Sequence, residues 1–403
     1  MPMTWTPPRP STRCGSSAAA MLMTQSPREI DVKPYVEHHP LVGYVYRPGV
    51  EMTLPTPEGG RYRIRVNAQG IRGDREYSAA TPPNVFRVVV LGDSVAAGQY
   101  CSNDERFSDL LEAGSADLEV INLALEGTGT DQQLLLLQDF ARRFEFDALL
   151  FCPYVENIRR NLVDYRVTAE AKTGRRVLTP KPRFTMEDGR LVLHNVPVPR
   201  ERPPLDQAAH ALRMRSDAMT RTRRTRAATV RLLERLGLKR WLYRVFRHEP
   251  FPEYRDPAGP AWQLMAALVA ECIATIGERP MIIVPQVYRA YVEHPLADNY
   301  LRRFRSLARP GRVYVFDILP WLRRLPAATR RACLWSDACH LTPLGHRVVA
   351  EAIRTEMQKV GLLPADEPRA PTPQPGVSRQ GLDAISAAGR LPRQSLERER
   401  CAS

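Results

Sequence analysis

The chain alternates short apolar runs with segments of helical periodicity. Five runs consist almost entirely of apolar residues: 88–91, 118–125, 147–154, 280–285 and 312–317. Four other segments carry apolar side chains at helical spacing: 105–113, 131–144, 261–277 and 343–361. Apolar runs that alternate with helices are typical of buried strands in a parallel sheet covered on both faces. The pattern therefore predicts an α/β fold built around five parallel strands.

Local signals predict where these helices begin and end. Asp131 stands at the start of the second helical segment and is its predicted N-cap. Gly277 follows the third segment, where a glycine is a natural C-cap. Pro343 opens the last segment, and proline is favoured in the first turn of a helix.

Three regions lie outside this strand–helix repeat. Residues 31–84 favour β-branched and aromatic side chains between prolines and glycines, which predicts a small β-rich lead-in. A basic internal insertion at about 164–259 separates the third strand from the fourth and begins with short β segments. The ends, residues 1–30 and 363–403, are rich in polar residues and proline without periodicity, so we expect disorder there. The main domain is then 85–362.

Composition supports a globular protein and places most of the net charge in one stretch. Of 403 residues, 43% are hydrophobic and 25% are charged, which suits one large α/β domain with an insertion. The net charge is +14, and residues 213–247 contribute +10 of it, with 12 Lys and Arg against 2 acidic residues. Helical spacing of apolar residues there favours a helix docked on the core. The alternative is a surface that contacts an anionic polymer, lipid or nucleic acid.

The cysteines and the hydropathy indicate a reducing compartment. The seven cysteines show no CxxC spacing, so neither a disulfide framework nor a zinc site is indicated. Cys101, Cys152 and Cys272 lie in or beside apolar segments and are expected in the core. No apolar run approaches the length of a membrane span, and no secretory segment stands out. We therefore expect a cytoplasmic protein.

Candidate chemistry begins where the first strand ends, in RVVVLGDSVAAG at residues 87–98. The apolar run stops at Gly-Asp-Ser, which places the hydroxyl of Ser94 at the carboxyl edge of the predicted sheet. Ligands and reacting groups collect at that edge in open α/β sheets. Ser94 is thus a candidate nucleophile; the alternative is that Asp93 or Ser94 caps a helix.

The second element is WSDACHLTPLGH at residues 335–346, where Asp337 and His340 are three residues apart. A serine nucleophile needs a base to remove its proton, and a carboxylate must hold that base in one tautomer and orientation. Asp337 lies 243 residues beyond Ser94. Parallel strands all end on the same side of a sheet, so the predicted fold can bring the two motifs together.

These two motifs resemble the SGNH or GDSL-type hydrolases over about residues 86–361. The resemblance implies a flavodoxin-like, three-layer α/β/α domain. It also implies that Ser94 is the nucleophile, that His340 is the general base and then the acid, and that Asp337 orients His340. The segment VNAQGIRGD at residues 66–74 is similar to a stretch that precedes the catalytic domain in many bacterial members.

An oxyanion formed at the ester carbonyl needs N–H donors aimed at its negative charge. The resemblance implies Gly127 as one donor, with Gly129 as the next candidate, beside the N–H of Ser94. The family usually shows Gly-x-Asn-Asp after the third strand, whereas this chain has YVENIRRN at residues 154–161. Asn157 is the predicted side-chain donor. In a shifted alignment Glu156 would take that position, and its carboxylate would repel an oxyanion.

Other polar residues have simpler interpretations. His346 is expected to pack on the closing helix or lie at the surface, Asp317 to cap a helix, and Asn161 to sit in a helix or loop. His38, His39 and His294 lack a partner pattern. We expect no cofactor and no metal, because no phosphate-binding loop or metal-ligand cluster stands out.

The function predicted from these motifs is a serine esterase acting on a small-molecule or carbohydrate acyl ester, with O-acetyl on a carbohydrate implied by the resemblance. Two alternatives stay open. The same triad could transfer the acyl group to a sugar hydroxyl, which would make the protein an O-acyltransferase. A non-catalytic protein could instead bind its partner through the arginine-rich stretch 213–247. The sequence leaves the oligomeric state open.

Overall fold

The computed structural model describes residues 33–169, 173–205, 248–337 and 339–364. The chain divides into two units, Met1–Glu356 and Met357–Ser403, and the fold described here is that of the first unit, with the last helix continuing into the second. The predictions for residues 1–30, for the basic stretch 213–247 and for the tail beyond Pro364 lie outside the described residues.

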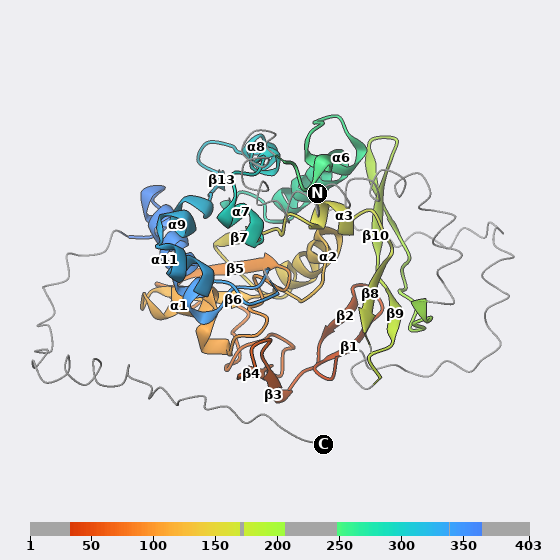
Figure 1. Ribbon diagram of the computed structural model, residues 1–403, viewed down its shortest axis with the longest axis horizontal. Coiled ribbons are helices and arrows are strands. Elements are labelled where there is room, and N and C mark those ends of the chain that lie inside the picture. Colours follow the sequence, from red (N-terminus) through yellow and green to blue (C-terminus); the bar gives the residue numbers. More distant parts are fainter. Residues whose placement is uncertain (1–32, 170–172, 206–247, 338, 365–403) are drawn as a thin grey trace, which may run out of the picture. The chain divides into compact units, whose positions relative to one another are not determined.

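A five-stranded parallel sheet forms the centre of the first unit (Figure 1). Its order is β13-β12-β7-β5-β6, so the first strand in sequence is flanked by the second and third, as in flavodoxin-like sheets. This confirms the predicted α/β class and strand number. The strands are β5 (Phe86–Gly92), β6 (Leu118–Asn122), β7 (Ala148–Cys152), β12 (Met281–Ile283) and β13 (Val313–Val315).

Helices cover both faces of the sheet and bury its apolar runs (Figure 1). The principal ones are α1 (Phe107–Ala113), α2 (Thr130–Ala141), α6 (Pro260–Thr275) and α11 (Pro343–Lys359). On one face α2 packs beside α6, where the Thr130 hydroxyl lies 3.4 Å from the Met265 sulfur. On the other face Arg354 of α11 donates to the Leu111 carbonyl of α1 at 2.8 Å. Three layers result, with β5 and β7 buried from both sides.

The predicted N-cap of the second helix is wrong. Helix α2 begins at Thr130, and its N-cap is Gly129 rather than Asp131. The Asp131 side chain instead turns into the core, where it forms a fully buried ion pair with Lys181. Burial of the carboxylate is tolerated because the ammonium group accompanies it. The predicted helix ends at Gly277 and Pro343 are confirmed: Gly277 follows α6 with a φ of 63°, and Pro343 is the first residue of α11.

The lead-in consists of two antiparallel hairpins: β1 (Val36–His39) with β2 (Gly43–Tyr46), and β3 (Glu51–Pro55) with β4 (Arg61–Arg65). Apolar and aromatic side chains of both hairpins share one buried cluster, which includes Tyr46, Ile64 and, from the loop after β6, Leu125. The Tyr44 hydroxyl also donates to the carbonyl of Glu126 at 2.6 Å. The lead-in is therefore packed against the carboxyl edge of the sheet.

The first half of the insertion forms two further antiparallel ribbons: β8 (Tyr165–Ala169) with β9 (Arg176–Pro180), and β10 (Arg183–Glu187) with β11 (Arg190–His194). Lys181 lies directly after β9, so its buried ion pair with Asp131 joins the ribbons to α2. A second link runs to the lead-in, where the N–H of Val198 donates to the Pro40 carbonyl at 2.7 Å.

Short helices complete the described parts of the chain: η2 (Asn103–Glu105), α3 (Asn157–Arg160), η3 (Pro252–Tyr254), α7 (Arg289–Glu293), α8 (Asn299–Arg305), α9 (Leu319–Arg324) and α10 (Ala327–Ala332). Among the residues that the structure describes, none of the helices is both long and apolar enough to traverse a lipid bilayer.

Candidate active site

Ser94 lies two residues beyond β5, at the carboxyl edge of the sheet. Residues 94–100 form successive turns, with the Ala97 N–H donating to the Asp93 carbonyl at 2.8 Å. No helix begins at this point, so neither Asp93 nor Ser94 is a helix cap. Gly92 allows this turn to sit close to the next strand, because a Cβ at that position would lie 2.9 Å from the Cys152 carbonyl oxygen.

The structure brings His340 to Ser94. The Nε2 atom of His340 lies 2.8 Å from the Ser94 hydroxyl, and both residues are more than 90% buried. On the other side of the ring, Nδ1 contacts the Asp337 carboxylate at short range. A carboxylate only accepts hydrogen bonds, so Nδ1 carries the proton and Nε2 is the acceptor for the serine hydroxyl. The three side chains thus form a continuous hydrogen-bonded chain.

Asp337 is oriented by the backbone of its own loop. Its Oδ1 accepts the N–H groups of Cys339 and His340, each at 3.1 Å, which leaves Oδ2 to face the imidazole. Partial burial disfavours the charge, but the bond to His340, the attraction to its ring and the two N–H donors outweigh it and lower the pKa of Asp337 to about 2. The carboxylate is therefore ionised at neutral pH.

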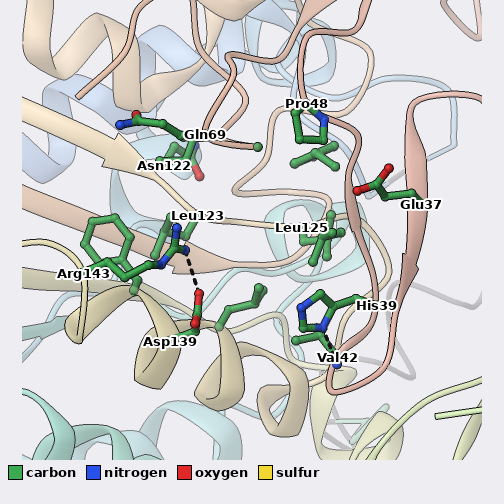
Figure 2. A pocket seen from close by; sticks show the side chains of 16 residues that line it. Glu37, His39, Val42, Pro48, Gln69, Asn122, Leu123, Leu125, Asp139 and Arg143 are labelled. Atoms are coloured by element: carbon green, nitrogen blue, oxygen red, sulfur yellow. Dashed lines mark hydrogen bonds and ion pairs between the residues drawn. The ribbon is translucent and has the colours of Figure 1, made fainter. Parts of the chain in front are cut away.

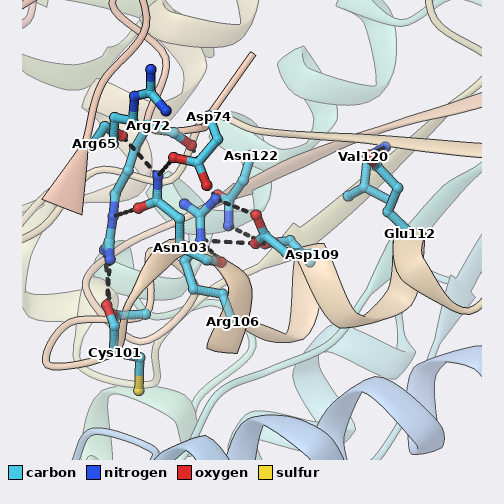
Figure 3. A network of polar contacts seen from close by, with 12 residues as sticks. Arg65, Arg72, Asp74, Cys101, Asn103, Arg106, Asp109, Glu112, Val120 and Asn122 are labelled. Carbon is cyan, nitrogen blue, oxygen red and sulfur yellow. Dashed lines mark hydrogen bonds and ion pairs between the residues drawn. The ribbon is translucent and has the colours of Figure 1, made fainter. Parts of the chain in front are cut away.

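The lead-in holds the loop that follows Ser94. Figure 3 shows Arg72, a fully buried residue of the segment that precedes the sheet, reaching Asn103 and the Cys101 carbonyl. Its guanidinium also donates to the Ala97 carbonyl at 2.6 Å. Tyr100 lies in the same loop, and its ring meets the His340 ring edge-on at 5.2 Å. The loop therefore contacts His340 and also carries Ser94.

The backbone N–H groups of Ser94 and Gly127 are candidates for the oxyanion donors predicted from the sequence. Within the described residues, neither the N–H of Ser94 nor that of Gly127 is bonded to an acceptor. Gly127 has a φ of 80°, and a Cβ there would lie 3.0 Å from the Tyr44 hydroxyl, so the position favours glycine. Gly129 differs, because its N–H donates to Gln132 and it caps α2.

The segment after β7 contains Asn157, Glu156 and Arg160, which have different surroundings. Asn157 opens α3 and is fully buried, and neither its amide nitrogen nor its amide oxygen has a partner among the described residues. It does not line the cavity at Ser94, whereas Arg160 does. Glu156 is half-exposed and forms an ion pair with Arg160 at 2.9 Å, and Arg160 also reaches Asp93 at 2.6 Å. The charge of the Glu156 carboxylate is thus neutralised by the Arg160 guanidinium.

A cavity of about 250 Å³ contains Ser94 and His340. The sheet domain contributes Ser94, Gln99, Glu126, Gly127, Arg160 and His340 to its wall. The lead-in contributes Lys33, Val36 and Tyr44, and the insertion contributes Arg166, Thr168, Thr179 and Arg202. A larger cavity of about 370 Å³ lies between the first hairpin and α2, lined by His39 and Asp139 among others (Figure 2), and its wall includes none of Ser94, Asp337 and His340.

Several residues of this wall were not predicted from the sequence. The spacing of Glu156 and Arg160 at i and i+4 indicates an ion pair on a helix, but no local signal shows that the arginine reaches Asp93. Arg166 and the two threonines come from a ribbon whose position depends on the distant Asp131. The presence of these residues in the cavity wall follows only from the tertiary fold.

The remaining predicted residues have structural contacts. His346 is fully buried, accepts the Phe107 N–H at 3.2 Å and has its pKa lowered to about 3 by burial and by nearby arginines. Asp317 accepts the Leu319 N–H at the start of α9, and Asn161 accepts the Thr130 N–H at the start of α2. Cys101, Cys152 and Cys272 are buried, as expected.

One group of side chains in the described residues has metal-ligand chemistry. Donor atoms of Asp337, Cys339 and His340 lie within 4.8 Å of one another. In this structure the Nδ1 atom of His340 is committed to Asp337, and burial together with the Asp337 charge raises the pKa of the Cys339 thiol to about 12. The geometry fits a histidine that is hydrogen-bonded to Asp337 better than a set of metal ligands.

Comparison with known proteins gives structural neighbours only; no family model and no curated sequence matches the chain. The lipase/acylhydrolase from Enterococcus faecalis is 12% identical, covers 70% of this chain and 100% of its own, and has a TM-score of 0.38. A member of the lipolytic protein G-D-S-L family from Veillonella parvula is 9% identical over 66% and 96%, with a TM-score of 0.36. The psychrotrophic esterase EstA from Pseudoalteromonas sp. is 11% identical over 68% and 97%, with a TM-score of 0.35.

Proposed function

We propose that the protein is a serine esterase that hydrolyses a short acyl ester. The observation that carries the proposal is the hydrogen-bonded chain from Ser94 through His340 to Asp337, with 2.8 Å between Nε2 and the hydroxyl oxygen. A buried serine paired with an imidazole that a carboxylate orients is the arrangement that activates a hydroxyl for acyl transfer.

The reaction follows from these contacts. The Ser94 oxygen attacks the ester carbonyl while Nε2 of His340 takes the hydroxyl proton. The tetrahedral intermediate then collapses: the bond to the alcohol oxygen breaks, and His340 returns its proton to that oxygen. Water enters, gives a proton to His340 and attacks the acyl-serine, which releases the carboxylic acid and restores the hydroxyl. Asp337 stays ionised and stabilises the imidazolium in both halves.

N–H donors stabilise the negative charge that develops on the carbonyl oxygen. Ser94 and Gly127 supply two, because their backbone N–H groups have no acceptor within the described residues. Asn157 is the proposed third donor: its side-chain amide is buried and has no partner within the described residues, although the residue does not line the cavity at Ser94. Removal of one such donor typically costs about 2.7–4 kcal/mol in the barrier.

The cavity favours a short acyl group. Its volume of about 250 Å³ is smaller than the volume of typical pockets for drug-sized ligands. Acetyl fits this limit, and an O-acetyl group on a carbohydrate is the substrate that the resemblance of the motifs implies.

Turnover of 4-nitrophenyl acetate by the purified protein tests the proposal. We expect Ser94→Ala to lower kcat by about 10³- to 10⁶-fold while the thermal transition stays in place, because the nucleophile alone is removed. Ser115→Ala, on the turn after α1, serves as the matched control and keeps wild-type turnover. Ser94→Ala with wild-type turnover would exclude the proposed function.

A further inference from the structure

The ribbon wall of the cavity, formed by Arg166, Thr168 and Thr179 of β8 and β9, presents one face to the site. Side chains alternate along a strand, so Arg166 and Thr168 share a face of β8. Thr179 pairs directly with Arg166 across the ribbon and lies on the same face, and its hydroxyl is 2.6 Å from that of Thr168. All three line the cavity that contains Ser94, while Val167 on the other face is exposed. The register therefore aims Arg166 at the site.

Most charged side chains of this cavity wall have partners; among the described residues of the wall, Arg166 does not. Lys33 forms an ion pair with Glu126, a carboxylate of the same wall, which also accepts the Tyr35 hydroxyl at 2.7 Å. Arg160 is held by Asp93 and Glu156.

Arg166 has a different environment. Within the described residues its guanidinium makes no hydrogen bond and no ion pair, and the carboxylates whose charge acts on it, Glu156 and Asp93, are already bonded to Arg160. Burial and the adjacent positive charge of Arg160 lower the pKa of Arg166. A half-buried cation without a counter-ion, next to another cation, is costly unless an anion joins it.

We propose that Arg166 binds an anionic group of the substrate, a carboxylate or a phosphate, while the ester carbonyl sits at Ser94. A guanidinium offers paired N–H donors that match either group. One hydroxyl of the Thr168–Thr179 pair donates to the other, so the pair adds one further donor on the same face. The inference deepens the proposed function and rests on it: the esterase acts on an acyl ester that carries a negative charge in preference to a neutral one.

Matched ester pairs measure this preference directly. One pair is the acetyl ester of lactate and the methyl ester of that compound; the other is acetylated glycerol 3-phosphate and monoacetylglycerol. We expect the wild type to prefer the charged member of at least one pair by about 10- to 100-fold in kcat/KM, in line with hydrogen bonds to charged groups. Preference in the first pair identifies a carboxylate, and preference in the second a phosphate. Equal turnover within both pairs would overturn the proposal.

Variants assign the preference to the residue. Arg166→Gln is expected to lower the charged-to-neutral ratio to within threefold of one, and Arg166→Lys to keep part of it because the charge remains. Arg190→Gln is the matched control: it replaces an exposed arginine in the neighbouring β10–β11 ribbon, outside the cavity wall. A wild-type ratio in Arg166→Gln would contradict the assignment.

Inorganic phosphate provides a readout that does not depend on the chosen esters. It should inhibit hydrolysis of the neutral esters competitively, with an inhibition constant at least tenfold higher in Arg166→Gln than in the wild type. An equal constant in both proteins would count against the subsite. Ser94→Ala separates the two proposals: Ser94-dependent turnover without charge preference overturns only the subsite, whereas turnover independent of Ser94 overturns the esterase itself.

Discussion

The two walls of the cavity around Ser94 are built in different ways. One wall comes from the carboxyl edge of the parallel sheet, where Ser94 and His340 are more than 90% buried and bonded to each other. The opposite wall comes from the β8–β9 ribbon, where Arg166 is half-buried and has no bonding partner among the described residues. The proposed reacting groups are thus held together in the protein without substrate, while the ribbon carries the charge that the proposed substrate would neutralise.

This difference separates reaction chemistry from substrate selection. Strand ends of a parallel sheet meet at one edge, so the core fold alone brings Ser94 and the Asp337 loop together. The ribbon belongs to an insertion and is joined to the core through the buried pair of Lys181 and Asp131. Changes at the sheet edge should therefore affect every ester, and changes in the ribbon should affect charged esters selectively.

After substitution of Ser94, the largest loss of activity at the sheet edge is expected for Asp337→Asn. The amide can no longer fix the tautomer of His340, and loss of about 10⁴-fold in kcat is expected for charged and neutral esters alike. Because its pKa is about 2, Asp337 stays ionised in wild-type assays above pH 4, so its protonation contributes nothing to their pH–rate profile. Steady-state kinetics across pH 4 to 9 check both statements. An activity loss restricted to charged esters would place Asp337 with the ribbon instead.

The next largest effect is expected for the ion pair that joins the β8–β9 ribbon to α2. Asp131→Asn leaves the Lys181 ammonium buried without its carboxylate, and breaking such a pair typically costs about 3–5 kcal/mol. The free energy of unfolding, measured in urea, should fall by that amount. Replacing both residues, as Asp131→Asn with Lys181→Met, should recover a substantial part of the loss. A double variant as unstable as the single one would show that the pair is not what attaches the ribbon.

Asn157→Ala tests whether α3 belongs to the sheet-edge wall. If its amide donates to the oxyanion, kcat falls by about 10²- to 10³-fold for neutral and charged esters, with little change in KM. The measurement is a full kinetic comparison on both members of one ester pair. A kcat within threefold of the wild type would leave only the Ser94 and Gly127 N–H groups as donors.

The smallest expected effect is a pH dependence of stability that comes from His346, far from the ribbon. Burial lowers its pKa from 6.5 to about 3, so between these values the unfolded chain binds a proton that the folded chain does not. The stabilisation is complete above pH 6.5 and declines as the pH falls toward 3, by up to about 1.4 kcal/mol per pH unit. His346→Gln should flatten this slope in denaturation experiments from pH 7 to 4. An unchanged slope would assign it to other groups.

The positions of Ser94, Asp337 and His340 at the sheet edge could be predicted from the sequence because the signals for them are local. Strand β5 is an uninterrupted apolar run that stops at a serine, and Asp337 reaches His340 within one short loop. The wrong N-cap at Asp131 shows the limit of such signals. Its partner Lys181 lies 50 residues later in the chain, so a buried ion pair replaced the expected cap.

The ribbon wall could not be predicted because its role depends on where the ribbon lies. Residues 165–169, YRVTA, show a strand pattern without any feature of a binding site. Only the register with β9 and the link from Lys181 to α2 turn Arg166 toward Ser94. The motif around Asn157 departs from the family pattern, and the structure places Arg160 in the cavity wall, three residues further along α3.

Covalent labelling with a fluorophosphonate tests the central claim most directly. The reagent bonds to a serine oxygen with loss of fluoride, and it requires the activated hydroxyl that the contact with His340 implies. The wild type should take up one label per chain on the peptide that contains Ser94, and Ser94→Ala should take up none, as read by mass spectrometry of the intact protein and its peptides. Equal labelling of Ser94→Ala, or a folded wild type that takes up no label, would contradict the account.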